Sequence, residues 1–296
     1  MIEFKKLELE DKARIQQYTM KSSRRNCDLT FANLYSWRFL YNTEIAEYGD
    51  CLLFRFDTDN MPAYMLPVGN GDLKEVIEGI MEDASMHGFP FRMFGVCADA
   101  VSQIEEVFPN RFSFEAERDY ADYLYLHTDL ATLKGKKYQP KRNHINKFKN
   151  LYPDYEFKPL TREMIPDCIR LEMEWCKANN CKENEALQDE RRSINAALEK
   201  FQELDIIGGV LMIKGQIAGF TYGAPLNHET FDTCVEKADT AYEGAYAVLN
   251  NEFAKMIPEQ FVYINREEDL GLEGLRKAKL SYNPHIILDK FKMQLK

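Results

Sequence analysis

Several features that identify whole classes of protein are missing from this sequence. Its seven cysteines are odd in number and form no CxxC pair, which argues against a disulfide framework and against a zinc knot. The longest apolar run, residues 206–213, contains two glycines and is too short to cross a bilayer, and the first residues include no apolar signal segment. We therefore expect a cytoplasmic protein without a metal site.

The chain does contain enough apolar residues for well-packed cores. Of its 296 residues, 45% are hydrophobic and 12% are aromatic. The formal net charge of −10 is unevenly placed: residues 1–133 hold 13 lysines and arginines against 23 acids, a difference of −10, and the remainder holds 25 of each. One large or two ordinary domains are expected, with the acidic excess confined to the first.

The pattern of apolar residues repeats along the chain. In the second half it predicts a strand over 155–159, helices over 162–177 and 185–204, a hairpin turning at Lys214-Gly215, a strand over 230–236, a helix over 245–256, a strand and a helix within 261–283, and a last strand over 285–292. The first half shows a similar order, including a helix begun by Asp72 as its N-cap. We predict an internal duplication, with domains at 1–133 and 151–296 joined by a basic segment, 134–150.

The stretch 261–284 organises the second half. An apolar run breaks into the polar loop 265–269, and a helical pattern follows. At 3.6 residues per turn, Lys279 shares a face with Leu275 and Tyr282. Either Lys279 lies along the core edge and pairs with an acid of the loop, or it presents its charge to an anionic or carbonyl-bearing substrate.

Two runs in this stretch carry a resemblance: NREEDLG at 265–271 and GLRKAKLSY at 274–282. They resemble an uncharacterised bacterial family of double-domain proteins related to the C-terminal catalytic domain of phosphatidylglycerol lysyltransferase. Those proteins have GNAT (acetyltransferase-like) folds and are kin to the Fem-type peptidoglycan aminoacyltransferases. The resemblance implies an α/β (α+β) fold, a tandem duplicated GNAT-like architecture of mixed central sheets flanked by helices, with the active site in the second domain.

The loop 236–246 bears on the acyl donor. In GNAT enzymes that use coenzyme A, the third helix begins with an Arg/Gln-x-x-Gly-x-Gly/Ala loop whose amides hold the pyrophosphate. Here Gly244 lies near the helix start, but Asp239 and Glu243 beside it would oppose pyrophosphate binding. The same acids could be ordinary first-turn residues that favour the helix dipole, or they could pair with the ammonium of an aminoacyl donor.

The candidate site residues follow from these two segments. The expected catalytic residues are Lys279, Glu267 and Asn265. The expected substrate-binding residues are Glu236, Asp239, Tyr242, Glu243, Gly244, Tyr246, Asp269, Arg276 and Tyr282. Attack on an aminoacyl ester needs positioning, oxyanion stabilisation and a base, so no serine or cysteine triad is required.

Residues 134–149 carry seven lysines and arginines and no acid. A solvated linker helix and a phosphate-binding surface both fit this composition. The stretch also resembles the Gly-Lys-Lys-x-x-x-x-Arg-Asn segment that opens the lysyltransferase catalytic domain. That resemblance implies contact with the acceptor end of tRNA or with a lipid headgroup through Lys137, Lys141, Arg142, Asn143 and Lys147.

Three hypotheses for the function follow. The leading one is an aminoacyl transferase that uses aminoacyl-tRNA and a peptide, lipid-headgroup or other amine or hydroxyl acceptor. The second is an acetyl-CoA-dependent N-acetyltransferase, which would need free amides at residues 244–246 for the pyrophosphate. The third is a noncatalytic binding protein, which would show no closed cleft between its two halves.

Overall fold

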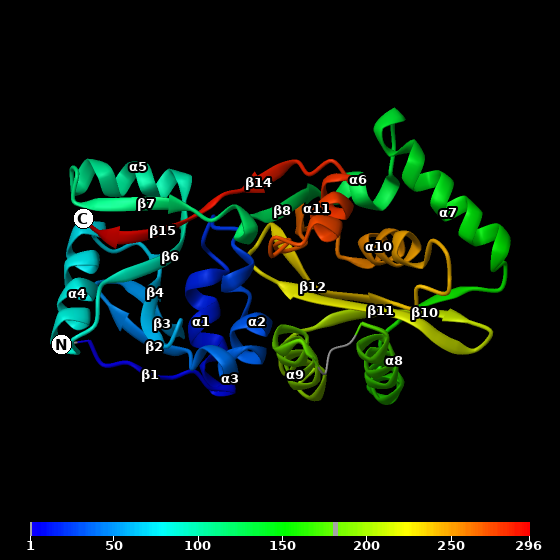
Figure 1. Ribbon diagram of the computed structural model, residues 1–296, viewed down its shortest axis with the longest axis horizontal. Helices are drawn as coiled ribbons and strands as arrows, with labels where there is room; N and C mark the ends of the chain where they lie inside the picture. Colours follow the sequence, from blue (N-terminus) through cyan, green and yellow to red (C-terminus); the bar gives the residue numbers. More distant parts are fainter. Residues whose placement is uncertain (1, 180–182) are drawn as a thin grey trace.

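The structure, a computed structural model, describes residues 2–179 and 183–296. Two mixed sheets follow one another along the long axis, and both ends of the chain lie at the end formed by the first sheet (Figure 1). Within the described residues, no helix has both the length and the apolar composition needed to span a membrane.

The first sheet has the strand order β1-β2-β3-β4-β6-β15-β7, with β5 paired to β3. Its strands are β1 (Lys5–Lys6), β2 (Glu44–Tyr48), β3 (Cys51–Thr58), β4 (Met61–Met65), β5 (Val68–Gly69), β6 (Arg92–Cys97), β7 (Phe112–Ala116) and β15 (Lys290–Leu295). The helices of this half are α1 (Lys12–Thr19), α2 (Phe31–Ser36), α3 (Arg38–Tyr41), α4 (Leu73–Met86) and α5 (Ala98–Val107). The expected N-cap of α4 is confirmed, because the Asp72 side chain accepts a hydrogen bond from the Glu75 amide at 2.9 Å.

The second sheet has the order β14-β8-β13-β12-β11-β10-β9. Its strands are β8 (Asp122–Leu126), β9 (Glu156–Pro159), β10 (Ile207–Ile213), β11 (Gln216–Pro225), β12 (Thr230–Ala238), β13 (Tyr263–Asn265) and β14 (Ile286–Leu288). The helices are α6 (His127–Thr132), α7 (Gln139–Leu151), α8 (Ile165–Ala178), α9 (Glu185–Glu199), α10 (Ala245–Met256) and α11 (Glu273–Leu280). Helices α8 and α9 lie on one side of β10–β12, and α10 lies on the other (Figure 1).

Local signals in the second half are confirmed. The hairpin β10–β11 turns at Lys214 (φ 50°) and Gly215 (φ 77°), where positive φ values match the tight turn that the sequence predicts. The helix expected over 245–256 is α10. The last expected strand, 285–292, is two strands, β14 and β15.

The two sheets exchange strands. Strand β8 lies within the expected first domain, but it pairs with β13 and β14 in the second sheet. Strand β15 lies within the expected second domain, but it pairs with β6 and β7 in the first sheet. The sheets therefore depart from the expected ranges at these two strands, because periodicity predicts a strand and not its partner.

The halves also share an apolar core. One buried cluster joins α1, α2 and β2 of the first half to α8, α9, β10 and β11 of the second, with Phe31 and Phe220 among its members. Separate clusters fill the space under α4 and α5 and the space between α10 and the second sheet. The shared core places α2 against the second sheet, and this contact builds the site described below.

Insertion of β15 into the first sheet can be tested with Met293, which is fully buried opposite Met93 and Phe114. We expect Met293→Ala to lower the free energy of unfolding by about 2–5 kcal/mol, because it leaves a cavity in a packed core. Urea denaturation measures this. Leu295→Ala, on the same strand but 45% exposed, is the matched control and should cost under about 1 kcal/mol. Equal effects would contradict the observed position of β15.

Candidate functional site

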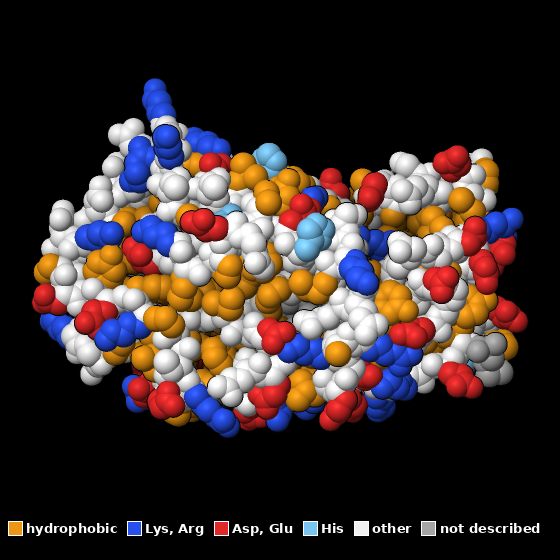
Figure 2. Space-filling model, turned by 180° about the vertical axis from the view of Figure 1, so that it is seen from behind, with side chains coloured by type: hydrophobic (Ala, Val, Ile, Leu, Met, Phe, Trp, Pro, Cys, Tyr) orange, Lys and Arg blue, Asp and Glu red, His pale blue; other side chains and the backbone are white. Residues whose placement is uncertain are grey.

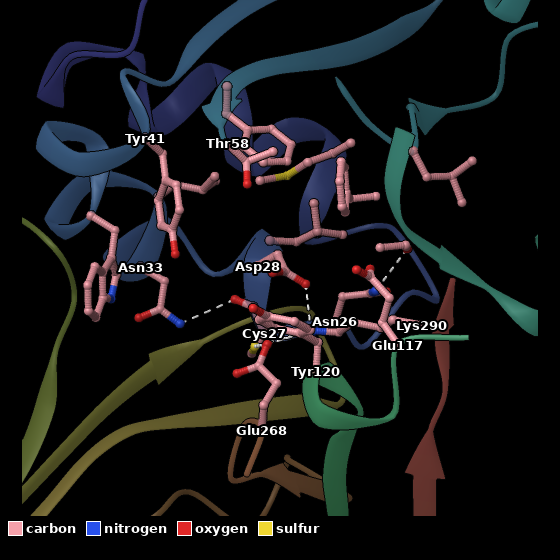
Figure 3. A pocket seen from close by; sticks show the side chains of 18 of the residues that line it. Asn26, Cys27, Asp28, Asn33, Tyr41, Thr58, Glu117, Tyr120, Glu268 and Lys290 are labelled. Carbon is pink, nitrogen blue, oxygen red and sulfur yellow. Dashed lines mark hydrogen bonds and ion pairs between the residues drawn. The ribbon is translucent and has the colours of Figure 1, made fainter. Parts of the chain in front are cut away.

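A pocket of about 400 Å³ opens between the two halves. Side chains from both halves line it, as Figure 3 shows for Asn33, Tyr41 and Glu268. Its walls carry the aromatic side chains Trp37, Tyr41, Phe56, Phe94 and Tyr120. Its charged lining residues are Arg24, Asp28, Asp59, Glu117, Glu267, Glu268, Lys290 and Lys292. The pocket lining therefore contains five carboxylates against three cations, together with five aromatic side chains.

Two strands of the second sheet diverge beside the pocket. Strands β12 and β13 pair in parallel from Thr230↔Tyr263 to Asp232↔Asn265. Beyond this point β12 continues to Ala238, whereas the chain leaves β13 after Asn265. The loop that leaves β13 carries Glu267 and Glu268 into the pocket lining.

Lys290 lies at the centre of a buried acidic cluster. Its Nζ lies 2.7 Å from Asp28 Oδ2, 2.8 Å from Asp122 Oδ1 and 2.7 Å from Glu268 Oε1. Burial alone would lower the pKa of Lys290, but the surrounding carboxylates, Asp122 first, raise it well above its usual value. Burial raises the pKa of Asp122 to about 6, whereas Lys290 holds the pKa of Glu268 below its usual value against the effect of burial. The ammonium thus offsets part of the repulsion among the three carboxyl groups.

A second acidic group lies beside the first. Asp232 Oδ2 accepts hydrogen bonds from Thr30 Oγ1 at 2.7 Å and from Asn33 Nδ2 at 3.1 Å. The same Asn33 nitrogen donates to Glu267 Oε1 at 2.8 Å. Burial, reinforced by the neighbouring carboxylates, raises the pKa values of Asp232 and Glu267 well above their usual range.

These two groups contain the donor atoms that a metal ion would use. Cys27, Asp122 and Glu268 form one set, and Asp232, Cys234 and Glu267 form the other. In the first set the Lys290 ammonium contacts all three members, including Cys27 Sγ at 3.6 Å. In the second, the Asn33 amide bonds both carboxylates. A protein nitrogen therefore already fills the position of a cation in each set.

The three residues expected to be catalytic lie near one another but differ in their contacts. Asn265 is buried and donates to Asp122 Oδ2 at 2.9 Å, and its Oδ1 accepts the Glu267 amide at 2.7 Å. Among the described residues, the pocket lining includes Glu267 but not Lys279. The Lys279 ammonium is buried and donates to the backbone carbonyls of Arg266 and Glu268. Lys279 thus holds the loop that carries the pocket acids.

Several expected substrate-binding residues contact other side chains of the protein and, among the described residues, are absent from the pocket lining. Glu236 Oε2 accepts from Arg266 Nε at 2.9 Å, and Arg266 lies over the Tyr282 ring. The Arg276 guanidinium binds Asp269 through two bonds of 2.8 and 2.7 Å. Burial opposes ionisation of Asp269, but bonds from Arg276 and Tyr123 hold its pKa well below its usual range.

The start of α10 is covered by α7. A Cβ atom at Gly244 would lie 3.1 Å from the His144 carbonyl oxygen. The Ala245 amide donates to the Tyr242 carbonyl, and the exposed Glu243 pairs with Lys147 at 2.6 Å. Two other expected residues of this segment lie apart from the pocket lining: Asp239, which accepts the Ala241 amide, and Tyr246, which is 39% exposed.

Most of the basic segment is engaged within the chain. Lys137 pairs with Asp129 at 3.1 Å, and Arg142 donates to the carbonyls of Leu133 and Gly135. Lys141 lies 3.9 Å from the Tyr282 ring centroid, and burial lowers its pKa to about 8. Asn143 is exposed. Figure 2 shows lysine and arginine side chains gathered on the projecting connection between α6 and α7.

Sequence reasoning missed the residues that come from the first half and from the last strand. Asp28, Asn33 and Asp122 lie in segments whose pattern predicts only helix or strand. Lys290 and Lys292 alternate with Phe291 and Met293, a pattern typical of a strand whose polar face meets solvent. No local signal sets Lys290 apart, because its immediate neighbours are Asp289 and Phe291.

Comparison with known proteins shows the family. The family described as "Phosphatidylglycerol lysyltransferase, C-terminal" matches residues 19–293. A conserved protein of unknown function from Bacteroides thetaiotaomicron VPI-5482, solved by crystallography, is 56% identical over 100% of both chains, with a TM-score of 0.98. An uncharacterised protein of Mycoplasmoides gallisepticum is 28% identical over 173 residues, which are 57% of this chain and 54% of that protein. The chain thus spans about half the length of this curated relative.

More distant solved structures show the fold. The C-terminal domain of a proposed lysylphosphatidylglycerol synthetase from Agrobacterium fabrum is 14% identical, with coverage of 97% and 92% and a TM-score of 0.69. The structure of L-PGS from Bacillus licheniformis is 16% identical, with coverage of 88% and 86% and a TM-score of 0.62. A tandem GNAT protein from clavulanic acid biosynthesis is 12% identical, with coverage of 99% and 98% and a TM-score of 0.50. The predicted tandem GNAT-like fold is confirmed.

The buried ion pair of Asp269 makes stability depend on pH. A carboxylate whose pKa is lowered by folding adds stability above its unfolded pKa of about 3.9 and loses it as the pH falls through the folded value. We expect Asp269→Asn to lower the Tm at pH 7 by about 5 °C or more, and this difference to shrink progressively as the pH falls below about 4. Thermal denaturation followed by circular dichroism measures both. Asp119→Asn, which removes a 57% exposed partner of the same arginine, should change the Tm little at either pH.

Proposed function

The chain belongs to the family of phosphatidylglycerol lysyltransferase C-terminal domains, and we therefore propose that it is an acyltransferase that moves an aminoacyl group from aminoacyl-tRNA to an amine or hydroxyl acceptor. One observation carries the proposal: an acidic, aromatic pocket lies between the two halves, where β12 and β13 diverge. In this arrangement the acyl group lies in the pocket and the acceptor reaches it through the opening.

The lining of the pocket suits an acyl group that bears an ammonium. Glu267, Glu268 and Asp28 supply carboxylates to this lining. Tyr41 and Tyr120 supply ring faces that attract a cation. An aminoacyl group carries an ammonium that can pair with both kinds of side chain, whereas an acetyl group carries no charge.

The start of α10 favours a donor other than coenzyme A. Pyrophosphate binding at a helix N-terminus requires accessible backbone amides. Here α7 packs against Gly244, and the amides of Ala245 and Ala247 donate to the carbonyls of Tyr242 and Gly244. The nearby Glu243 carboxylate would also repel a phosphate.

The acceptor is an amine or hydroxyl, with a lipid headgroup or a peptide as the proposed classes. The Agrobacterium protein of similar fold is described as a proposed lysylphosphatidylglycerol synthetase, and the Bacillus protein as L-PGS. A lipid headgroup acceptor for this chain rests on that likeness, whereas a peptide or small amine would meet the same chemistry in the pocket. The proposed tRNA contact lies on the basic segment, 134–150.

The reaction is tested with labelled, unfractionated aminoacyl-tRNA and a cell extract separated into lipid, peptide and small-amine fractions. We expect label to move from tRNA into one fraction in the presence of the protein. We also expect no rise in Tm with acetyl-CoA, because a ligand that binds the native state stabilises it. No transfer together with a clear acetyl-CoA shift would replace this proposal with a coenzyme A-dependent acetyltransferase.

The tRNA contact is tested by charge reversal on exposed lysines of the basic segment. We expect Lys137→Glu and Lys147→Glu each to weaken binding of aminoacyl-tRNA and to reduce the slope of log K against log salt by about 1, because each removes a phosphate contact. Gel-shift assays over a salt series measure this. Lys74→Glu, on α4 of the first half, is the matched control. An equal loss in the control would make the effect one of overall charge and contradict a local contact.

A further inference from the structure

One amide from the first half bridges two carboxyl groups of the second. Asn33, on α2, donates through Nδ2 to Asp232 Oδ2 at 3.1 Å and to Glu267 Oε1 at 2.8 Å. The same nitrogen lies 3.3 Å from the carbonyl oxygen of Cys27. Three acceptors surround one NH₂ group, so its orientation is well determined.

The two carboxyl groups differ in their access to the pocket. Asp232 is fully buried, and its Oδ1 has no hydrogen-bond partner among the described residues. Glu267 is half-buried and lines the pocket. Water and substrate can therefore reach Glu267, whereas Asp232 is sealed beneath it. An ionised carboxylate is least costly where solvent or a cation can reach it.

Negative charge exceeds positive charge around this pair. Five carboxyl groups, Asp28, Asp122, Asp232, Glu267 and Glu268, share the region with the ammonium groups of Lys279 and Lys290. The titratable groups that act on the pair from the surrounding elements are Asp122 of β8, Tyr222 of β11, Cys234 of β12, Glu268, Lys279 of α11 and Lys290 of β15. Two lysines cannot balance five carboxylates, of which Asp122 and Asp232 are fully buried, so protons must supply part of the difference.

We propose that Asp232 and Glu267 share one proton, held on Asp232, and that Asn33 keeps Glu267 ionised toward the pocket as the general base of acyl transfer. The catalytic part rests on the proposed function above. Glu267 is then the catalytic residue, and Asn33 and Asp232 are positioning residues. A carboxyl pair of this kind titrates as a unit, with apparent pKa values that belong to the pair.

The chemical step balances without a redox partner. The Glu267 carboxylate takes the proton from the attacking amine or hydroxyl as the nitrogen or oxygen forms its bond to the ester carbon. The carbonyl electron pair moves to the oxygen and then returns. The bond from carbon to the ribose oxygen breaks, and Glu267 gives the proton to that oxygen. The proton on Asp232 stays in place throughout.

This arrangement assembles the base only when the halves are joined. Asn33 and Thr30 come from the first half, whereas Asp232 and Glu267 come from β12 and from the loop after β13. Without the Asn33 side-chain amide, Asp232 and Glu267 would have fewer hydrogen-bond donors for their negative charge. Glu267 would then keep its proton to higher pH, because the Asn33 bond lowers its pKa.

The shared proton is tested first, without any substrate. The infrared spectrum of the full chain at pH 7 should contain the carbonyl band of a neutral carboxyl group, and Asp232→Asn should remove it. Asp119→Asn, at an exposed carboxylate, should leave the band unchanged. Identical spectra for the wild type and Asp232→Asn would overturn the shared proton.

The catalytic role is tested by transfer from labelled aminoacyl-tRNA to the acceptor fraction that is active with the wild type. We expect Glu267→Gln to lower kcat by about 10²–10⁴-fold, the range of general-base catalysis, with a much smaller effect on aminoacyl-tRNA binding, because Glu268 and Asp28 also line the pocket. Asp119→Asn, at an exposed carboxylate outside the pocket lining, should stay within about threefold of the wild type. Wild-type rates in Glu267→Gln would overturn the catalytic role.

The pH profile separates positioning from simple loss of structure. Asn33→Ala removes a hydrogen-bond donor that favours the ionised form of Glu267. The acid limb of the kcat/KM profile should therefore move to higher pH by about one unit. At pH values below the limb, kcat/KM should be about tenfold lower than in the wild type. Ser36→Ala removes the bond from α2 to Ser193 without touching the carboxyl pair and should not move the limb. An unmoved limb in Asn33→Ala would overturn its positioning role. A wild type that transfers nothing would overturn the proposed function and the catalytic role together, while the infrared result would still decide the shared proton.

Discussion

The ion pairs of Lys290 are the interaction on which the site depends. Its ammonium contacts Asp28, Asp122 and Glu268, which come from the first half, from β8 and from the loop after β13. A buried carboxylate without a partner is costly, and removing one member of such a network leaves the others uncompensated. One side chain of the last strand therefore holds together three segments that are far apart in the sequence.

Strand exchange explains how Lys290 reaches this position. Strand β15 lies between β6 and β7 of the first sheet, and β8 lies between β13 and β14 of the second. Each half thus contains a strand from the part of the chain expected to form the other. A duplicated fold whose halves only touched could open along their interface, whereas here backbone hydrogen bonds tie each sheet to the other half. The pocket between the halves is consequently a fixed part of the architecture.

The sequence predicted what depends on neighbouring residues. The turn at Lys214-Gly215 and the cap at Asp72 need only local conformation and a nearby amide, and both are confirmed. The partners of β8 and β15 could not be predicted, because alternation identifies a strand without saying which strand it pairs with. The polar contacts of the site could not be predicted either, because their members are far apart in the sequence: Asn33 and Glu267 are separated by 234 positions.

The helical pattern correctly places Lys279 on the apolar face of its helix, but the pattern does not determine what the side chain does. Its place on the apolar face of α11 distinguishes it from the other cations of the helix, and the structure shows it buried. Its ammonium bonds the carbonyls of Arg266 and Glu268, which flank Glu267. Glu267 has φ of 57°, a left-handed conformation that non-glycine residues adopt only when their surroundings impose it. Lys279 thus fixes the backbone on both sides of the strained residue, and its charge affects the pocket through the geometry of the loop.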